Sequence, residues 1–240
     1  MDYAIDISNL VVEFPVPGGR MRALDGLNLR VCPGQVYGFL GPNGAGKTTT
    51  MHILLGFITA TSGTARLLGE AVSGPIARQR IGYLPEHPDT YRFLTGRELL
   101  TLAGRLFLMP RAALRQRVDE LLALVGLTQA ADRRIGVYSR GMLQRIGLAQ
   151  ALVHDPDLVI LDEPTSGFDP LGRIDVRTLI AGLKARGKTV FFSSHELSEV
   201  ERVCDHIGIL AKGKLVSEGT VDALVKADES LEQYFLRMVS

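Results

Sequence analysis

A glycine-rich loop followed at once by a cation and hydroxyl groups stands at residues 41–50, GPNGAGKTTT. It fits the pattern G-x-x-x-x-G-K-[ST], in which successive backbone N–H groups surround a polyphosphate. We expect Lys47 to bridge the β- and γ-phosphates of a nucleotide and Thr48 to offer its hydroxyl to Mg²⁺. The predicted phosphate site consists of Gly41, Pro42, Asn43, Gly44, Ala45, Gly46, Lys47, Thr48 and Thr49.

Two adjacent carboxylates, Asp162 and Glu163, follow the apolar run LVIL. In an open parallel sheet, ligands bind at the carboxyl ends of the strands, where we also expect the phosphate loop. Asp162 fits a carboxylate that anchors Mg²⁺. Glu163 is placed to orient or deprotonate a water molecule that attacks the γ-phosphate. The alternative is a pair of solvated acids at a strand end.

Short apolar runs alternate with helical patterns, as expected of a fold that positions these groups. The run QVYGFLG leads into the loop, and residues 47–56 have helical spacing. Residues 3–14 and 23–31 predict an antiparallel pair separated by PVPGGR. The expected fold class is α/β: a P-loop NTPase (RecA-like) core with a mostly parallel sheet, an N-terminal antiparallel β subdomain and an inserted all-helical subdomain.

The stretch from residue 92 to 153 shows helical patterns and no convincing strand. We therefore expect one domain of 240 residues, with a nucleotide-binding core at 1–91 and 154–225, a helical subdomain at 92–153 and a helical tail at 226–240. A later helix is expected to begin at Asp169 as N-cap, followed by Pro170. Its predicted apolar stripe is Leu171, Ile174, Ile180 and Leu183.

Five motifs, in order, resemble those of the nucleotide-binding subunit of ATP-binding cassette (ABC) transporters. GPNGAGKTT resembles the Walker A motif, YSRGMLQR the signature motif, LVILDEP the Walker B motif, SGFDP the D-loop and SSHE the switch histidine. The resemblance covers almost the whole chain. GYLPEH and YSRGM are most similar to the subgroup that serves ABC-2-type exporters.

The resemblance implies that two copies pack head to tail and bind ATP and Mg²⁺ between them. Ser139 and Gly141 of one copy would contact the γ-phosphate held by the other, and Asp169 would cross the interface. His195 would hydrogen-bond the γ-phosphate and hold the attacking water, which makes Lys47, Glu163 and His195 the expected catalytic residues. Phe14 would stack on adenine, although an aromatic residue in a strand also suits the core.

Two of the motifs depart from the family's usual pattern. Arg140 and Met142 replace a glycine and a glutamine of the signature, and Arg140 either adds charge near the nucleotide or faces solvent. Glu86 stands where the family commonly has a glutamine that touches Mg²⁺ and relays the nucleotide state to the membrane subunit. A carboxylate there can still accept a hydrogen bond from a metal-bound water, but it adds negative charge.

The expected partners are a second ATP-binding subunit, which we take to be identical, and an integral membrane permease. A groove beside Glu86, near Tyr91, Phe93 and Leu94, would receive a permease helix unless those side chains serve only as core. The first residues, MDYAIDISNL, do not resemble a secretory signal. We expect a cytoplasmic chain, peripheral on the inner face of the cell membrane through the permease, which powers export.

Two other classes of nucleotide-binding protein share some of these motifs. A soluble ABC ATPase would act on nucleic acid or ribosomes, but Lys plus Arg at 27 against Asp plus Glu at 26 gives no excess of positive charge, and we expect no nucleic-acid partner. No long heptad insertion or second cassette is present in the 240 residues. A P-loop kinase would need an acceptor pocket and a lid, and it would leave the signature and switch-histidine motifs unexplained.

Overall fold

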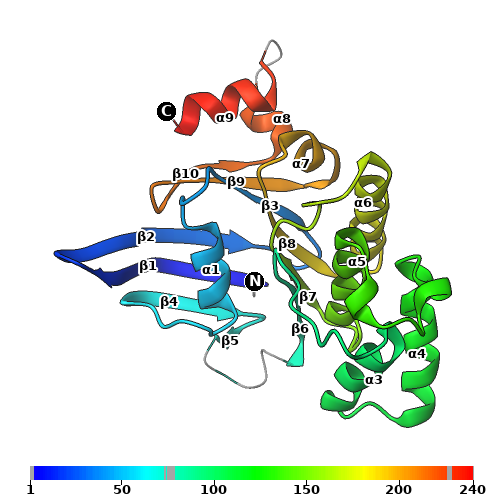
Figure 1. The fold of residues 1–240 in the computed structure, drawn as a ribbon. Helices are drawn as coiled ribbons and strands as arrows, with labels where there is room; N and C mark the ends of the chain where they lie inside the picture. Colours follow the sequence, from blue (N-terminus) through cyan, green and yellow to red (C-terminus); the bar gives the residue numbers. More distant parts are fainter. Residues whose placement is uncertain (1–2, 73, 75–78, 226–228, 240) are drawn as a thin grey trace.

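A six-stranded, mostly parallel sheet forms the centre of the molecule (Figure 1). The structure is a computed structural model, in which residues 3–72, 74, 79–225 and 229–239 are described. The strand order is β10-β9-β3-β8-β7-β6, and only β10 runs antiparallel to its neighbour. The strands are β3 (Val36–Leu40), β6 (Ile81–Leu84), β7 (Leu158–Leu161), β8 (Thr189–Ser194), β9 (His206–Ala211) and β10 (Lys214–Gly219).

A second, antiparallel sheet has the order β2-β1-β4-β5. Its strands are β1 (Ile5–Val16), β2 (Gly19–Val31), β4 (Ser62–Leu67) and β5 (Glu70–Ala71). β1 and β2 form the expected antiparallel pair, but β1 begins and ends two residues later than predicted and β2 begins four residues earlier. The turn is reduced to residues 17 and 18, because Gly18 adopts a φ of 90° and lets the ladder continue almost to the tip.

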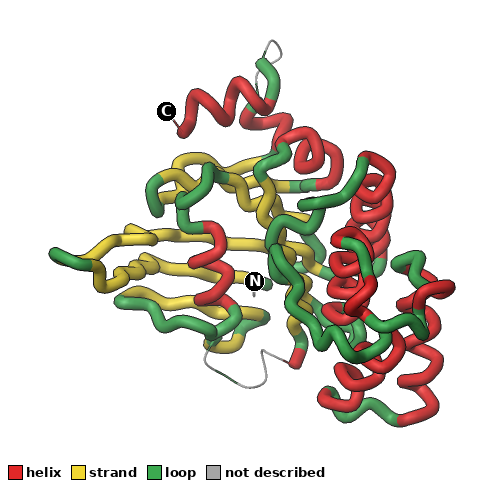
Figure 2. Tube along the Cα trace, in the orientation of Figure 1, coloured by secondary structure: helices red, strands yellow, loops and turns green. Residues whose placement is uncertain are grey.

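Helices pack mainly on one face of the six-stranded sheet (Figure 2). Between β6 and β7 the described chain forms only helices and two short 3₁₀ turns, apart from one isolated bridge between Thr95 and Arg134. The helices are α1 (Lys47–Leu54), α3 (Gly96–Leu106), α4 (Arg111–Leu124), α5 (Arg140–Ala151), α6 (Pro170–Ala185), α7 (Leu197–Val203), α8 (Val221–Leu224) and α9 (Leu231–Val239). Helix α9 falls within the expected tail, of which residues 226–228 and 240 lie outside the described residues.

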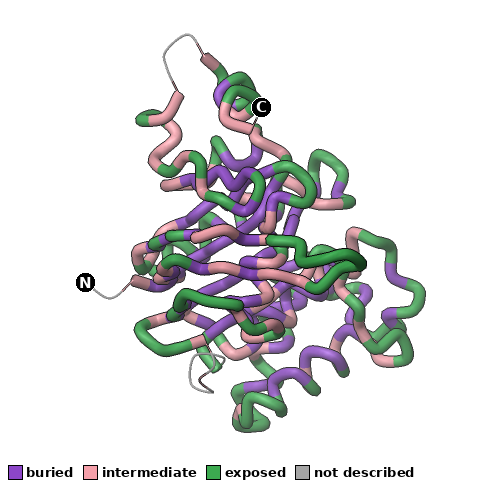
Figure 3. The backbone as a smooth tube through the Cα atoms, turned by 90° about the vertical axis from the view of Figure 1, so that its left-hand side faces the viewer, coloured by how far each residue is buried: buried purple, intermediate pink, exposed green. Residues whose placement is uncertain are grey.

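Two apolar cores lie on the two faces of the six-stranded sheet. Alternate side chains of one strand enter different cores: Val36 and Leu40 face the helices, whereas Tyr37 and Phe39 face α1 and the antiparallel sheet. Figure 3 shows the resulting buried strands at the centre of the molecule. This two-sided burial explains why these strands read as continuous apolar runs in the sequence.

The predicted apolar stripe of α6 is partly wrong. Leu171 and Ile174 are 73% and 46% exposed, and the buried face consists of Val176, Leu179, Ile180 and Leu183. The first turn of α6 packs on the preceding loop: a Cβ at Gly172 would lie 2.4 Å from the ring of Phe168. Helical spacing predicts a face but does not reveal at which turn the helix meets the sheet.

Candidate functional site

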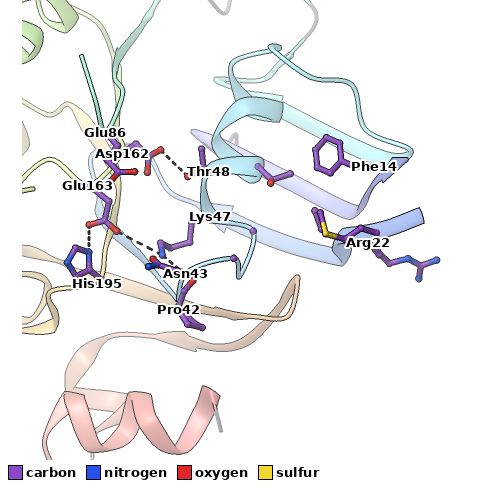
Figure 4. A pocket seen from close by; sticks show the side chains of 15 residues that line it. Phe14, Arg22, Pro42, Asn43, Lys47, Thr48, Glu86, Asp162, Glu163 and His195 are labelled. Atoms are coloured by element: carbon purple, nitrogen blue, oxygen red, sulfur yellow. Dashed lines mark hydrogen bonds and ion pairs between the residues drawn. The ribbon is translucent and has the colours of Figure 1, made fainter. Parts of the chain in front are cut away.

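The phosphate loop, the carboxylate pair and the tip of the antiparallel sheet line one cavity of about 530 Å³ (Figure 4). Phe14 and Arg22 lie on one side of the cavity and Glu163 and His195 on the other. Among the predicted site residues, the cavity is lined by Phe14, Pro42, Asn43, Gly44, Gly46, Lys47, Thr48, Thr49, Glu86, Asp162, Glu163 and His195. Gly41 and the buried Ala45 do not line it and instead support the loop from behind.

Two glycines of the loop are required by close approach. A Cβ at Gly41 would lie 2.4 Å from the carbonyl oxygen of Leu210, and one at Gly46 would lie 2.8 Å from that of Ala23. Gly46 also has a φ of 111°, which disfavours any residue with a side chain. These contacts hold the loop between β9 and β2, so that its outer surface faces the cavity.

Helix α1 begins at the end of this loop without a side-chain cap. Its N-cap is Gly46, whereas α3, α5 and α6 are capped by the side chains of Thr95, Ser139 and Asp169. The first-turn amides of α1 are therefore left for another acceptor. An anion at this helix start satisfies them and interacts favourably with the helix dipole.

Lys47 is a buried cation between the loop and the acids. Its Nζ donates a hydrogen bond of 2.6 Å to the carbonyl oxygen of Gly41 and lies 4.0 Å from Oε1 of Glu163. Burial lowers the pKa of Lys47, and the charges of Glu163, Asp162 and Glu86 oppose that shift. The cation thus lies within reach of both the loop and the acidic side of the cavity.

Asp162 is held between two hydroxyl groups. Thr48 Oγ1 donates to Oδ2 of Asp162 at 3.1 Å, and Ser193 Oγ donates to Oδ1 at 2.6 Å. Ser193 also accepts a hydrogen bond of 2.9 Å from the amide of Glu163, so one buried serine of β8 fixes both acids. We predicted no role for Ser193 from the sequence, although it lies two residues before His195.

Thr48 and Asp162 fit a Mg²⁺ site. Their oxygens are hard ligands on adjacent strand and helix ends, and Mg²⁺ is usually held by one or two such protein groups together with substrate phosphates and water. In the described ranges, no group of three or more His, Cys, Asp and Glu side chains is placed to hold a metal. A cage made only of protein ligands is therefore not the arrangement found among these residues.

Glu163 and His195 form a pair at the outer end of β7 and β8. Oε2 of Glu163 lies 2.8 Å from Nδ1 of His195, and Glu163 is 7% exposed. Burial raises the pKa of the Glu163 carboxyl group, and His195 and Lys47 oppose that shift. The backbone of Glu163 has a φ of 50°, an uncommon conformation for this residue type, which the hydrogen bond to Ser193 supports.

The side of the cavity opposite the acids carries residues of the β1–β2 ribbon. Phe14 pairs with Met21 across the two strands, and both line the cavity. Phe14 is half-buried: its ring packs partly against the core and partly faces the cavity. The cavity-lining Arg22, which the sequence reasoning missed, is tied to Glu13 and Asp25 by hydrogen bonds of 3.0 and 2.7 Å.

Ser139, Gly141 and Asp169 do not line this cavity. Ser139 caps α5 by accepting a hydrogen bond from the amide of Met142, and Asp169 caps α6 by accepting one from Gly172. Gly141 lies against the ring of Phe168, with open space on its other sides. These residues of two adjacent helix starts form a separate surface of the chain.

Arg140 neither lines the nucleotide cavity nor points freely into solvent. Its Nη2 donates a hydrogen bond of 3.0 Å to Ser166 Oγ, and its side chain covers Gly167, where a Cβ would lie 2.4 Å from Nε. Gly167 also has a φ of 79°. Arg140, which departs from the usual signature motif, therefore packs on the loop between Glu163 and α6 and hydrogen-bonds to it.

Glu86 lies at the edge of the cavity near Asp162 (Figure 4). Its Oε1 lies 3.9 Å from Nε2 of His87. Its side chain is half-exposed, so water can reach the added negative charge. This placement is compatible with an indirect contact to a metal through water.

The sequence pattern of the ABC transporter family matches residues 24–166, which contain the phosphate loop, the signature stretch and both acids. The chain belongs to the ABC transporter family. An uncharacterized ABC transporter ATP-binding protein of Nostoc sp. is 52% identical over 208 residues, covering 86% of this chain and 62% of the relative. The chain thus spans less than two thirds of that relative's length.

Two further comparisons agree with this family. A Nod factor export ATP-binding protein I of Paraburkholderia xenovorans is 41% identical, with 88% of this chain and 70% of the relative covered. A solved structure of an ATP-binding subunit of an ABC transporter superposes with a TM-score of 0.89 at 28% identity, over 98% of this chain and 99% of that one. The predicted α/β fold with a mostly parallel sheet is confirmed.

Proposed function

We propose that this chain is the ATP-binding and ATP-hydrolysing subunit of an ABC transporter, and that two copies close around two Mg·ATP to power a separate membrane permease. One observation carries the proposal: a single cavity unites the phosphate loop, the Thr48–Asp162 pair and the Glu163–His195 pair in a chain of this family. The exporter assignment rests on the GYLPEH and YSRGM motifs and on the export role named for the Nod factor relative.

Each group of the cavity has a distinct task in this proposal. The amides of the loop and of α1 bind the phosphates, and Lys47 bridges the β- and γ-phosphates. Glu163 orients the attacking water and accepts its proton, and the raised pKa of its carboxyl group brings its basicity closer to that needed near neutral pH. His195 holds the Glu163 carboxylate and contacts the γ-phosphate. Mg²⁺, held through Thr48 and Asp162 with Glu86 nearby, would neutralise charge on the phosphates.

Phe14→Ala is expected to weaken binding of ATP about tenfold while changing the affinity for inorganic tripolyphosphate less than about twofold. The ring at the cavity wall offers stacking area to adenine but touches no phosphate. Titration calorimetry with both ligands measures the difference. Equal losses for the two ligands, or a large fall in thermal stability alone, would show that Phe14 acts only as part of the core.

The second half of each ATP site would come from another copy of the chain. Ser139, Gly141 and Asp169 lie outside the cavity at the exposed starts of α5 and α6, with the exposed Leu171 beside them. A hydroxyl and free amides at a helix start suit the γ-phosphate of a partner's ATP. We infer a homodimer because one chain carries both halves.

Gly141→Asp tests this composite site. The position lies in the first turn of α5 and has room for a side chain. In the isolated chain, the helix dipole favours a carboxylate there, so the fold is expected to persist. The carboxylate would repel a partner's γ-phosphate and lower ATP hydrolysis by about 100-fold or more. Mixing this variant with Lys47→Ala should restore about a quarter of the hydrolysis, because mixed dimers keep one intact site. Unchanged hydrolysis by Gly141→Asp alone would contradict the composite site.

A second hollow, of about 270 Å³, is the proposed docking place of the permease. Its lining is mostly apolar and includes Tyr83, Tyr91, Leu102 and Phe107. Phe93 is exposed nearby, whereas Leu94 packs against the core. A permease helix at this groove would hold the chain at the inner face of the cell membrane. None of the helices in the described part of the chain is itself long and apolar enough to span a bilayer.

A further inference from the structure

The turn between α3 and α4 presents large apolar side chains that the nucleotide site does not use. Leu106 is 76% exposed and Leu108 is 89% exposed. Both amides that close the turn are hydrogen-bonded, from Leu108 to Arg105 and from Met109 to Gly104 at 2.9 and 3.1 Å. The leucines therefore project from an ordered turn.

The two helices approach each other closely at this end, as Figure 1 shows for α3 and α4. A Cβ at Gly104 would lie 2.2 Å from a methyl group of Leu114, so a larger residue there would require Leu114 to shift. The turn is consequently tight, and Leu108 adopts a φ of 57° at its apex. The backbone thus directs an apolar side chain outward rather than into either core.

Three exposed arginines lie before and after this turn in sequence and line a hollow of about 510 Å³ formed by residues of α3 and α4. Arg105 ends α3, and Arg111 and Arg115 lie one turn apart at the start of α4. No acidic partner is recorded for any of the three within the described ranges, whereas the neighbouring Arg97 is paired with Asp119 and Asp132. The hollow therefore carries a net positive charge.

The start of α4 adds further donors to the same place. Pro110 is the N-cap and supplies no side-chain hydrogen bond. Arg111 follows directly, although a cation at a helix start is unfavourable beside the helix dipole. A phosphate group at this position would accept hydrogen bonds from both the free amides and the guanidinium groups.

We propose that the α3–α4 turn, residues 105–111 together with Arg115, docks directly on an anionic phospholipid surface. The three arginines would bind lipid phosphates, and Leu108 at the apex of the turn would enter the headgroup region. Projecting apolar side chains flanked by cations are typical of segments that lie in a membrane interface. An acidic protein segment would match the arginines but would leave the outward leucines without a partner.

The position of the turn agrees with this partner. Leu106 and Phe107 also line the hollow proposed for the permease, so the turn would lie on the side of the molecule that faces the bilayer. That orientation rests on the proposed function. The lipid contact itself is a property of the isolated chain and is measured without ATP or permease, so the two proposals fail separately.

Co-sedimentation of the full chain with vesicles tests the proposal. Vesicles with about one third phosphatidylglycerol should bind at least about 100-fold more tightly than pure phosphatidylcholine, and the difference should shrink at high salt. Changing Arg105, Arg111 and Arg115 together to Gln should weaken binding to anionic vesicles by about 100-fold, at about fivefold for each charge. A matched control changes three exposed arginines elsewhere, Arg66, Arg186 and Arg202, to Gln and should weaken binding less than about threefold.

Leu108→Asn tests the apolar contribution separately. Asparagine tolerates the positive φ, so the turn should persist, and binding should fall about fivefold at low and at high salt. Equal affinity of the wild type for both kinds of vesicle, or equal losses in the two arginine triples, would overturn the proposal. The proposal would also be overturned if the Arg105, Arg111 and Arg115 triple variant bound vesicles like the wild type but no longer bound a polyglutamate peptide. That result would identify an acidic protein as the partner.

Discussion

Glu163→Gln is expected to lower ATP turnover by about 100- to 10,000-fold and to leave ATP affinity within about threefold of the wild type. Glutamine keeps the volume of the side chain and can still bond to His195 but cannot accept the proton of the attacking water. Phosphate release measures turnover, and fluorescence titration with a labelled ATP analogue measures binding. Glu201 is exposed and forms no ion pair among the described residues, so it offers a matched control: Glu201→Gln should change neither quantity.

The pH dependence of the wild type separates a base from a purely structural acid. Because burial raises the pKa of Glu163 above the ordinary 4.5, its basic form is lost at a higher pH than for an exposed glutamate. Turnover should therefore fall as the pH decreases through that raised pKa. The residual turnover of Glu163→Gln should lack this acid limb. Unchanged hydrolysis in the variant would remove Glu163 from the proton-accepting role.

Lys47→Ala is expected to reduce affinity for ATP by at least about 100-fold, because a desolvated cation on two phosphates contributes several kcal/mol in a buried site. The loss should be as large for inorganic tripolyphosphate as for ATP, in contrast to Phe14→Ala. Together, Lys47→Ala and Phe14→Ala distinguish the part of the cavity that binds the phosphates from the part that binds adenine. Isothermal titration with both ligands gives the comparison.

Loss of Lys47 also leaves the buried Glu163 with less compensating charge. The 4.0 Å separation between Nζ and Oε1 means that the charge of Lys47 lowers the pKa of Glu163 in the wild type. Circular dichroism and the thermal midpoint therefore serve as the control for folding. A folded Lys47→Ala chain with undiminished ATP affinity would place the nucleotide elsewhere than the phosphate loop.

The local motifs of this chain were predictable because their chemistry is set by neighbours in sequence. The loop at residues 41–49 needs glycine where the backbone approaches other strands, and its lysine and threonine follow directly in α1. Asp162 and Glu163 end an apolar strand, and the parallel-sheet rule alone brings them to the same edge as the loop. The cavity confirms that placement, whereas the individual roles remain predictions.

Contacts between segments that are distant in sequence could not be predicted from local sequence patterns. Ser193 bonds to both acids across a strand pair, and nothing in its local sequence marks it as different from Ser194. Arg140 packs on Gly167, which lies 27 residues later in another motif. The exposed Leu171 and Ile174 look like core in a helical pattern, because periodicity carries no information on what covers each turn.

Light scattering of purified Glu163→Gln in saturating Mg·ATP tests most directly whether nucleotide joins two chains. We expect a shift from the monomer mass to twice that mass with Mg·ATP, no shift with Mg·ADP, and no shift when Gly141→Asp is added to the same variant. A Glu163→Gln chain that binds ATP tightly and nevertheless keeps the monomer mass at every ATP concentration would contradict this expectation.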